Sequence, residues 1–95
     1  MLLDFEKQAK EIIELSSNER QLDMVIEEMS ELTKAILKDR RYGTKTTRHN
    51  VYEELGDVYN MLKQLEIIYE FKWDELARTR YKKNCRTIKR LTDEL

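Results

Sequence analysis

The chain has 95 residues, with 18 Lys and Arg against 19 Asp and Glu and a formal net charge of −1. This length suits one small domain spanning residues 1–95, and the near-neutral charge gives no general attraction for nucleic acid or membranes. The single cysteine cannot form an intramolecular disulfide, and no stretch is apolar for the length of a membrane span. We therefore expect a cytoplasmic protein that engages neither membranes nor nucleic acid.

The distribution of residue types favours an all-α fold. The sequence has no proline and only two glycines, fewer turn-forming residues than a β-rich domain of this length normally needs. Hydrophobic residues make up 40% of the chain and recur every three or four positions, which is the period of an amphipathic helix. A chain this small buries a modest fraction of its surface, so we expect the helix bundle to be completed by association into a homodimer or homotetramer.

The apolar pattern predicts four helices in chain order. The first runs from about residue 3 to 15, and Ser16–Glu19 is interpreted as a capping box that begins a second helix ending near Arg40. The segment RYGTKTTRHN after Lys38-Asp39-Arg40 is the clear loop. Gly43 supplies the break in this loop, and its threonines and Asn50 are candidate caps for the third helix. The stretch Asn50–Glu53 resembles a capping box, or the helix begins one turn earlier.

The third helix is expected to end near Glu70, and a bend at residues 71–74 leads to the fourth. Tyr69 and Trp73 are interpreted as packing residues near this bend, although either could stack on a base. The apolar positions of the fourth helix, including Cys85 as a core residue, are Leu76, Tyr81, Cys85, Ile88, Leu91 and Leu95.

Two acidic pairs lie on or beside the apolar faces of the second and third helices. On a helical wheel Glu54 falls inside the stripe of the third helix and Asp57 falls on its edge, whereas Glu53 points away. Glu28 lies at the edge of the stripe of the second helix, with Glu31 one turn further on. If the two helices pack antiparallel, as their short connection indicates, four carboxylates meet in one place.

Converging carboxylates repel one another unless a positive charge sits among them. Oxygen ligands suit Mg²⁺, with Mn²⁺ as a substitute, better than zinc, which prefers nitrogen and sulfur. A di-iron bundle normally uses Glu-x-x-His pairs, and the only histidine, His49, is not in such a pair. The alternative is a solvated surface, because Glu-x-x-Glu is common by chance in a chain with 39% charged residues.

The two motifs, EEMSE at residues 27–31 and EELGD at residues 53–57, resemble the EE-x-x-E and EE-x-x-D signature of the MazG-like all-α nucleotide pyrophosphohydrolases. The resemblance is closest to the short, stand-alone phage and bacterial members. It implies magnesium-dependent cleavage of a nucleoside triphosphate to the monophosphate and pyrophosphate. The magnesium-binding and catalytic residues that it implies are Glu28, Glu31, Glu54 and Asp57. Glu27 and Glu53 could act as a base or support the ligands.

The fourth helix has no acid and seven basic residues between Leu76 and Thr92. Most of them are expected to be solvated, but Lys83 and Arg86, three apart, can reach one anion together. The resemblance implies a Lys and an Arg on the last helix that contact the triphosphate. Less certain candidates for phosphate binding are Lys34, Lys82 and Arg90, and Asn60 is a weak candidate for substrate binding.

Two kinds of alternative function remain open at the level of sequence. The same scaffold serves phosphoribosyl-ATP hydrolysis and hydrolysis of deoxyuridine or deoxycytidine triphosphate, and no base-reading element decides between them. A protein of another class, a non-catalytic helical module for oligomerisation or interaction, could also carry these acids.

Overall fold

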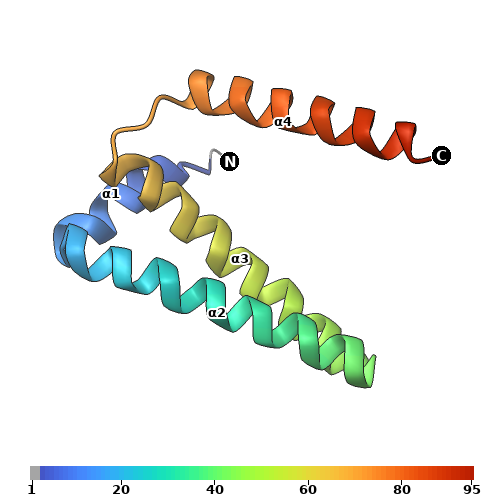
Figure 1. The fold of residues 1–95 in the computed structure, drawn as a ribbon. Coiled ribbons are helices and arrows are strands. Elements are labelled where there is room, and N and C mark those ends of the chain that lie inside the picture. Colours follow the sequence, from blue (N-terminus) through green and yellow to red (C-terminus); the bar gives the residue numbers. More distant parts are fainter. Residues whose placement is uncertain (1–2) are drawn as a thin grey trace.

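The computed structural model describes residues 3–95, and within this range every regular element is a helix. The helices are α1 (Phe5–Leu15), α2 (Asn18–Tyr42), α3 (Lys45–Ile68) and α4 (Trp73–Asp93), which confirms the all-α prediction. None of the helices in the described range is long and apolar enough to cross a membrane. Figure 1 shows α2 and α3 as a long antiparallel hairpin, α1 against one end of it, and α4 diverging from α3.

Helix α2 begins one residue later than the predicted capping box. Ser17 is the N-cap, and its side chain accepts a hydrogen bond from the backbone N–H of Arg20 at 3.1 Å. Three residues after Ser17 the chain has Arg20 rather than an acid, so the predicted reciprocal bond from Glu19 is wrong. The helix ends at Tyr42, two residues beyond the predicted Arg40, because Gly43 adopts the left-handed conformation with φ of 60°.

The turn between α2 and α3 is much shorter than the predicted loop. Thr44 caps α3 by accepting from the backbone N–H of Thr47 at 3.0 Å, while the Thr47 hydroxyl oxygen accepts from the backbone N–H of Thr44. This pair of threonines supplies both bonds of a capping box without a Glu or Gln. The prediction that α3 begins at an Asn50 cap is therefore wrong, and the alternative of an earlier start holds. The helix also stops at Ile68 rather than Glu70.

Two side-chain hydrogen bonds set the register of the hairpin. Near its open end, the amide nitrogen of Gln21 donates to the side-chain oxygen of Gln64 at 2.7 Å, and both residues are buried. Near the turn, the Thr47 hydroxyl donates to Asp39 Oδ1 at 2.9 Å. Because a hydrogen bond holds the two helices together at each end of the hairpin, the pairs of residues that face each other between these bonds are fixed.

The interior of the single chain is small. Among the described residues only four apolar side chains are buried, namely Ala9, Val25, Ala35 and Val58. The radius of gyration is 16.5 Å, whereas a compact domain of this length has about 12 Å. The excess comes largely from α4, which packs extensively against none of the other three helices.

The predicted core positions of α4 are exposed in the single chain. Tyr81, Cys85, Ile88 and Leu91 all lie on the surface, and no residue of α4 is buried. The prediction that Cys85 is a core residue is wrong for one isolated chain. Trp73 is 69% exposed, so it is not a packed residue at the bend either.

Candidate metal centre

The hairpin register brings together acids that are far apart in the sequence. Glu28 lies two helical turns after Gln21, and Asp57 lies two turns before Gln64. Since a helix repeats its facing side nearly every seven residues, the bonded glutamines predict that Glu28 and Asp57 face each other. Glu54 lies one turn from Asp57 on the same side of α3.

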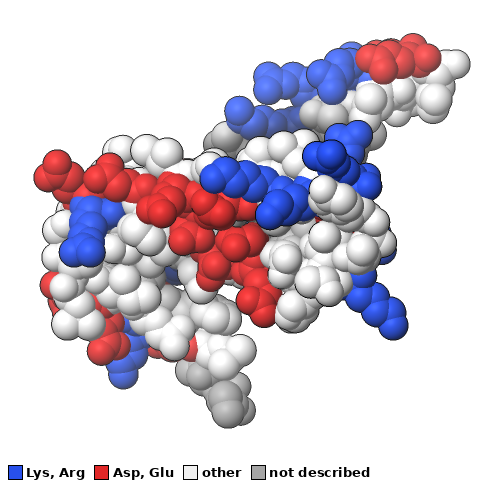
Figure 2. All heavy atoms as spheres, turned by 90° about the horizontal axis from the view of Figure 1, so that it is seen from below, with Lys and Arg blue, Asp and Glu red and all other residues white. Residues whose placement is uncertain are grey.

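The structure places three carboxylates in one cluster. One oxygen from each of Glu28, Glu54 and Asp57 lies within 4.8 Å of the other two. Glu28 and Glu54 are half-buried and Asp57 is exposed, so the group sits at the edge of the α2–α3 interface and opens to solvent. Figure 2 shows acidic side chains gathered in a continuous band on one face of the molecule, with Lys and Arg side chains along its margins.

No side-chain cation compensates these charges within the described part of the chain. None of the ion pairs at 4.0 Å or less involves Glu28, Glu54 or Asp57. Partial burial, followed by the charges of Asp57, Glu54, Glu27 and Glu31, raises the pKa of Glu28 above its ordinary value.

One carboxylate oxygen of Glu54 has no hydrogen-bond partner. Glu54 Oε2 is buried and has no hydrogen bond, and an unsatisfied buried carboxylate oxygen is costly unless a proton or a cation reaches it. The inward direction of Glu54, predicted from the helical wheel, is thus confirmed. Glu53 is exposed and is bonded instead to His49, with 2.8 Å between Oε1 and Nε2.

Glu31 does not join the cluster in this structure. Its carboxylate pairs with Lys34 on the same helix, with 3.4 Å between Oε1 and Nζ. Lys34, a less certain phosphate-binding candidate, is occupied by that pair. Both side chains are substantially exposed, so the pair is weak, and Glu31 still contributes to the negative potential at Glu28.

The three oxygens fit a hard divalent cation. With bond lengths of about 2.1 Å, ligands on opposite sides of an octahedral Mg²⁺ are about 4.2 Å apart and adjacent ligands are about 3.0 Å apart. The observed separations of up to 4.8 Å would have to shorten by up to about 1.8 Å, through rotation of the side chains, for all three oxygens to bind one ion. An all-carboxylate set on two rigid helices, open to water on one side, suits Mg²⁺ or Mn²⁺ and leaves room for substrate oxygens.

The predicted phosphate-binding residues are not brought to the cluster by their own chain. Lys82, Lys83, Arg86 and Arg90 are exposed on α4, which packs extensively against neither α2 nor α3. Asn60 is exposed one turn after Asp57 and lines a groove between α1, α3 and α4.

Sequence reasoning missed the residues that position the acids. Gln21 and Gln64 were not singled out, although their spacing of seven residues from Glu28 and Asp57 was a usable signal.

Comparisons with protein-family models, with curated proteins and with solved structures each gave no match. The likeness to the MazG-like superfamily therefore depends on the two sequence motifs alone.

Proposed function

We propose that this protein is a Mg²⁺-dependent nucleoside triphosphate pyrophosphohydrolase that works as a homo-oligomer. The observation that carries the proposal is the convergence of Glu28, Glu54 and Asp57 without a compensating side-chain cation. The spacing of these acids within the EE-x-x-E and EE-x-x-D motifs supports the same reading.

In the proposed reaction one water is consumed and one phosphoanhydride bond is broken, giving a nucleoside monophosphate and pyrophosphate. When bound, Mg²⁺ supplies charge neutralisation on the phosphate oxygens and lowers the pKa of a coordinated water. The cation would be held by Glu28, Glu54 and Asp57, which come from two helices. Hydrogen bonds on either side of the cluster fix the register of these helices. Glu31 is one turn from Glu28 and joins the ligand set if it leaves Lys34.

Of the two acids that directly precede cluster residues in the motifs, only Glu27 has a supporting role in this proposal. Glu27 is exposed beside Glu28 and raises its pKa, so it strengthens the field that attracts the cation. Glu53 faces solvent outside the cluster, where it is bonded to His49, and it takes no part in the proposed reaction. Lys83 and Arg86 are the residues proposed to hold phosphate oxygens, because a positioned cation stabilises charge that develops on them.

The test is pyrophosphate release from a panel of canonical and modified nucleoside triphosphates, with Mg²⁺ and with a chelator. The isosteric Glu54→Gln removes the buried carboxylate, and Glu53→Gln, the adjacent exposed residue, is the matched control. We expect release only with Mg²⁺, reduced at least about 100-fold by Glu54→Gln, the scale of losing one preorganised contact to the transition state. Equal activity in both variants would exclude the proposed site.

The same panel separates the related activities. Phosphoribosyl-ATP, dUTP and dCTP belong in it, since the proposed cluster contacts only phosphates and leaves the choice of base and sugar to other residues.

A non-catalytic role in oligomerisation or interaction is the second candidate, and the exposed apolar side of α4 favours it. Such a module requires no divalent cation. A folded protein that releases no pyrophosphate and is not stabilised by Mg²⁺ would favour this candidate over the enzyme.

A further inference from the structure

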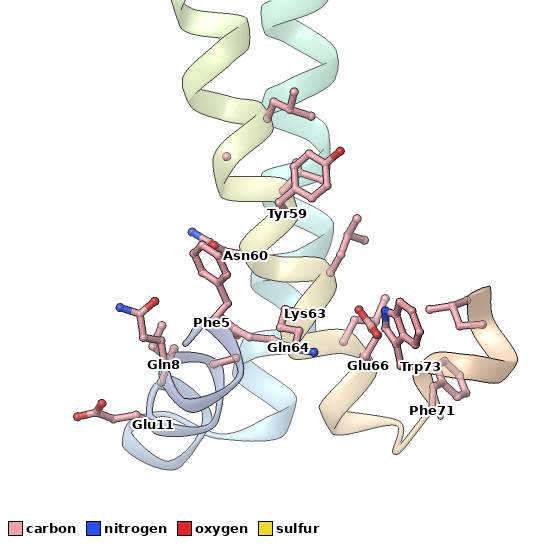
Figure 3. A pocket seen from close by; sticks show the side chains of 18 of the residues that line it. Phe5, Gln8, Glu11, Tyr59, Asn60, Lys63, Gln64, Glu66, Phe71 and Trp73 are labelled. Atoms are coloured by element: carbon pink, nitrogen blue, oxygen red, sulfur yellow. The ribbon is translucent and has the colours of Figure 1, made fainter. Parts of the chain in front are cut away.

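Gln64 is the only large side chain in the described range that is fully buried, although it is polar. Its partner Gln21 on α2 is 7% exposed. Figure 3 shows Gln64 on α3 between Phe5 of α1 and Trp73 of α4. The buried apolar side chains, by contrast, are alanines and valines. Since glutamine is mostly exposed in folded proteins, the burial of two glutamines against each other indicates a specific role.

The glutamine pair is not arranged for maximum stability. The amide nitrogen of Gln21 donates to Gln64 Oε1 at 2.7 Å, but Gln64 Nε2 is buried and has no hydrogen-bond partner within the described part of the chain. A buried donor without an acceptor destabilises a fold, whereas replacing both partners of a buried bond by apolar groups of similar shape can be neutral. What a buried polar pair can supply instead is one defined arrangement of two helices.

The pair is placed to control the part of the hairpin that the turn does not hold. Helix α2 ends at Tyr42 and α3 begins at Lys45, so the connection keeps the helices together at one end only. The Asp39–Thr47 bond and the Arg48–Asp39 ion pair lie near that end as well. Among the described side chains, the glutamines make the only hydrogen bond or ion pair that joins α2 to α3 beyond the acidic cluster.

A small change of angle at the turn becomes a large displacement at the cluster. Asp57 lies 12 residues after Lys45, which is about 18 Å along the helix axis. If the helices splayed by about 5° at the turn, they would move apart by about 1.6 Å at this point. The bond between the glutamines, seven residues beyond Asp57 on α3, opposes this splay.

The acidic cluster has little tolerance for a wider hairpin. Glu28 comes from α2, whereas Glu54 and Asp57 come from α3, so separation of the helices moves Glu28 away from both other acids. The oxygens are already up to 4.8 Å apart, and they have to approach by up to about 1.8 Å to bind one ion. Metal–oxygen bonds accept deviations of only about 0.2 Å. A hairpin wider by more than 1 Å therefore loses a ligand.

We propose that Gln21 and Gln64 are positioning residues for the metal centre, which act on metal affinity rather than on stability. Their hydrogen bond holds the hairpin closed at the end away from the turn, and so keeps Glu28 within reach of a cation bound by Glu54 and Asp57. They do not touch the cation, because each lies two helical turns from the nearest acid of the cluster. This inference rests on the proposed function for the site itself.

The test is to replace both glutamines by leucine and to measure metal binding directly. In the Gln21→Leu, Gln64→Leu double variant no amide is left unpaired, so we expect a folded protein, which circular dichroism checks. Mn²⁺ is the probe, because electron paramagnetic resonance reports the free ion and gives a Kd without any nucleotide. We expect the Kd for Mn²⁺ to rise at least tenfold, whereas a merely structural role would leave the Kd of the folded protein unchanged.

Two further variants make the result specific. Gln8→Leu is the same substitution at an exposed position of α1, and it should leave the Kd unchanged. A Gln21→Met, Gln64→Met double variant has unbranched side chains of similar length without an amide, and it should weaken Mn²⁺ binding as the leucine pair does. It also replaces the leucine pair if that variant does not fold.

Three outcomes overturn this inference alone. A folded leucine or methionine double variant that binds Mn²⁺ as tightly as the native protein means that the hairpin stays closed without the amides. An equal loss of affinity in Gln8→Leu means that the effect is not specific to the pair. Failure of both double variants to fold means that the pair acts on stability.

Failure of the proposed function has a different result in the same experiment. If the native protein binds no Mn²⁺, or if Glu54→Gln binds it as tightly as the native protein, the proposed metal site is wrong and the positioning role is overturned with it. The two failures are therefore distinguishable.

Discussion

Neutralising Glu54 should stabilise the metal-free protein and remove its response to Mg²⁺. The magnitude follows from the cluster, in which each pair of carboxylate oxygens is at most 4.8 Å apart. Coulomb's law gives about 0.9 kcal/mol per pair at this distance in water and about 3.5 kcal/mol at an effective dielectric constant of 20. Salt at ordinary concentrations screens little over such a distance, because the Debye length is about 10 Å.

Glu54→Gln removes two of the three pairwise repulsions and replaces the buried, unpartnered carboxylate oxygen by a neutral amide atom. Because the cluster lies at the edge of the interface, we expect a gain of about 1–3 kcal/mol in the free energy of unfolding without metal. Each kcal/mol corresponds to about 4–8 °C in Tm for a domain of this size. A Mg²⁺ concentration 100 times the Kd should stabilise the native protein by about 2.7 kcal/mol and the variant hardly at all.

The assay is urea unfolding followed by circular dichroism at fixed protein concentration, with a chelator or with MgCl₂, and with NaCl to equalise ionic strength. Glu53→Gln is the matched control, since its carboxylate is bonded to His49 outside the cluster. If Glu54→Gln destabilises the metal-free protein, or if both variants keep the full Mg²⁺ response, the reasoning about this site is refuted.

Three further predictions follow from particular groups. The pKa of Glu28 is raised in the folded protein, so its contribution to stability is fully present below its unfolded pKa and is lost as pH rises through the folded pKa. The free energy of unfolding, measured against pH with a chelator, should show this loss. Glu28→Gln should make the free energy of unfolding depend less on pH over the same range. Gln64→Leu alone should lower the free energy of unfolding by about 1–3 kcal/mol, because it leaves the buried Gln21 amide unpaired. The double variant with Gln21→Leu should recover most of this loss, and a double-mutant cycle measures the coupling. Glu70→Gly should raise the free energy of unfolding by about 1 kcal/mol, since a left-handed residue other than glycine is strained; a loss of stability in urea unfolding would contradict this account of the turn.

The helices themselves were predictable from the sequence because their signal is local. The sequence has an apolar residue at every third or fourth position, few turn-forming residues and no proline. This pattern indicated four helices, and all four are present. The errors lie at the ends. Among the candidate caps, Asn50 is not used. The threonine pair at Thr44 and Thr47 begins the helix earlier, with hydroxyl groups in place of the expected Glu.

The sequence by itself also determined the inward direction of Glu54, because its position within the apolar stripe follows from the helical repeat alone. Which acids meet was decided only by tertiary structure. The Gln21–Gln64 and Asp39–Thr47 bonds set the hairpin register that brings Glu28 to Glu54 and Asp57, and a wheel of one helix contains no information on that register.

The position of α4 likewise depended on the folded chain. Its apolar side predicted a buried helix, yet the Schellman turn at Glu70 directs it away from α3 and leaves that side exposed. The periodic apolar residues indicate that one face of the helix requires burial. They do not indicate whether the same chain or a second copy buries that face. That choice depends on the exit angle after Ile68 and on the charges that the helix meets, both of which only the three-dimensional arrangement provides.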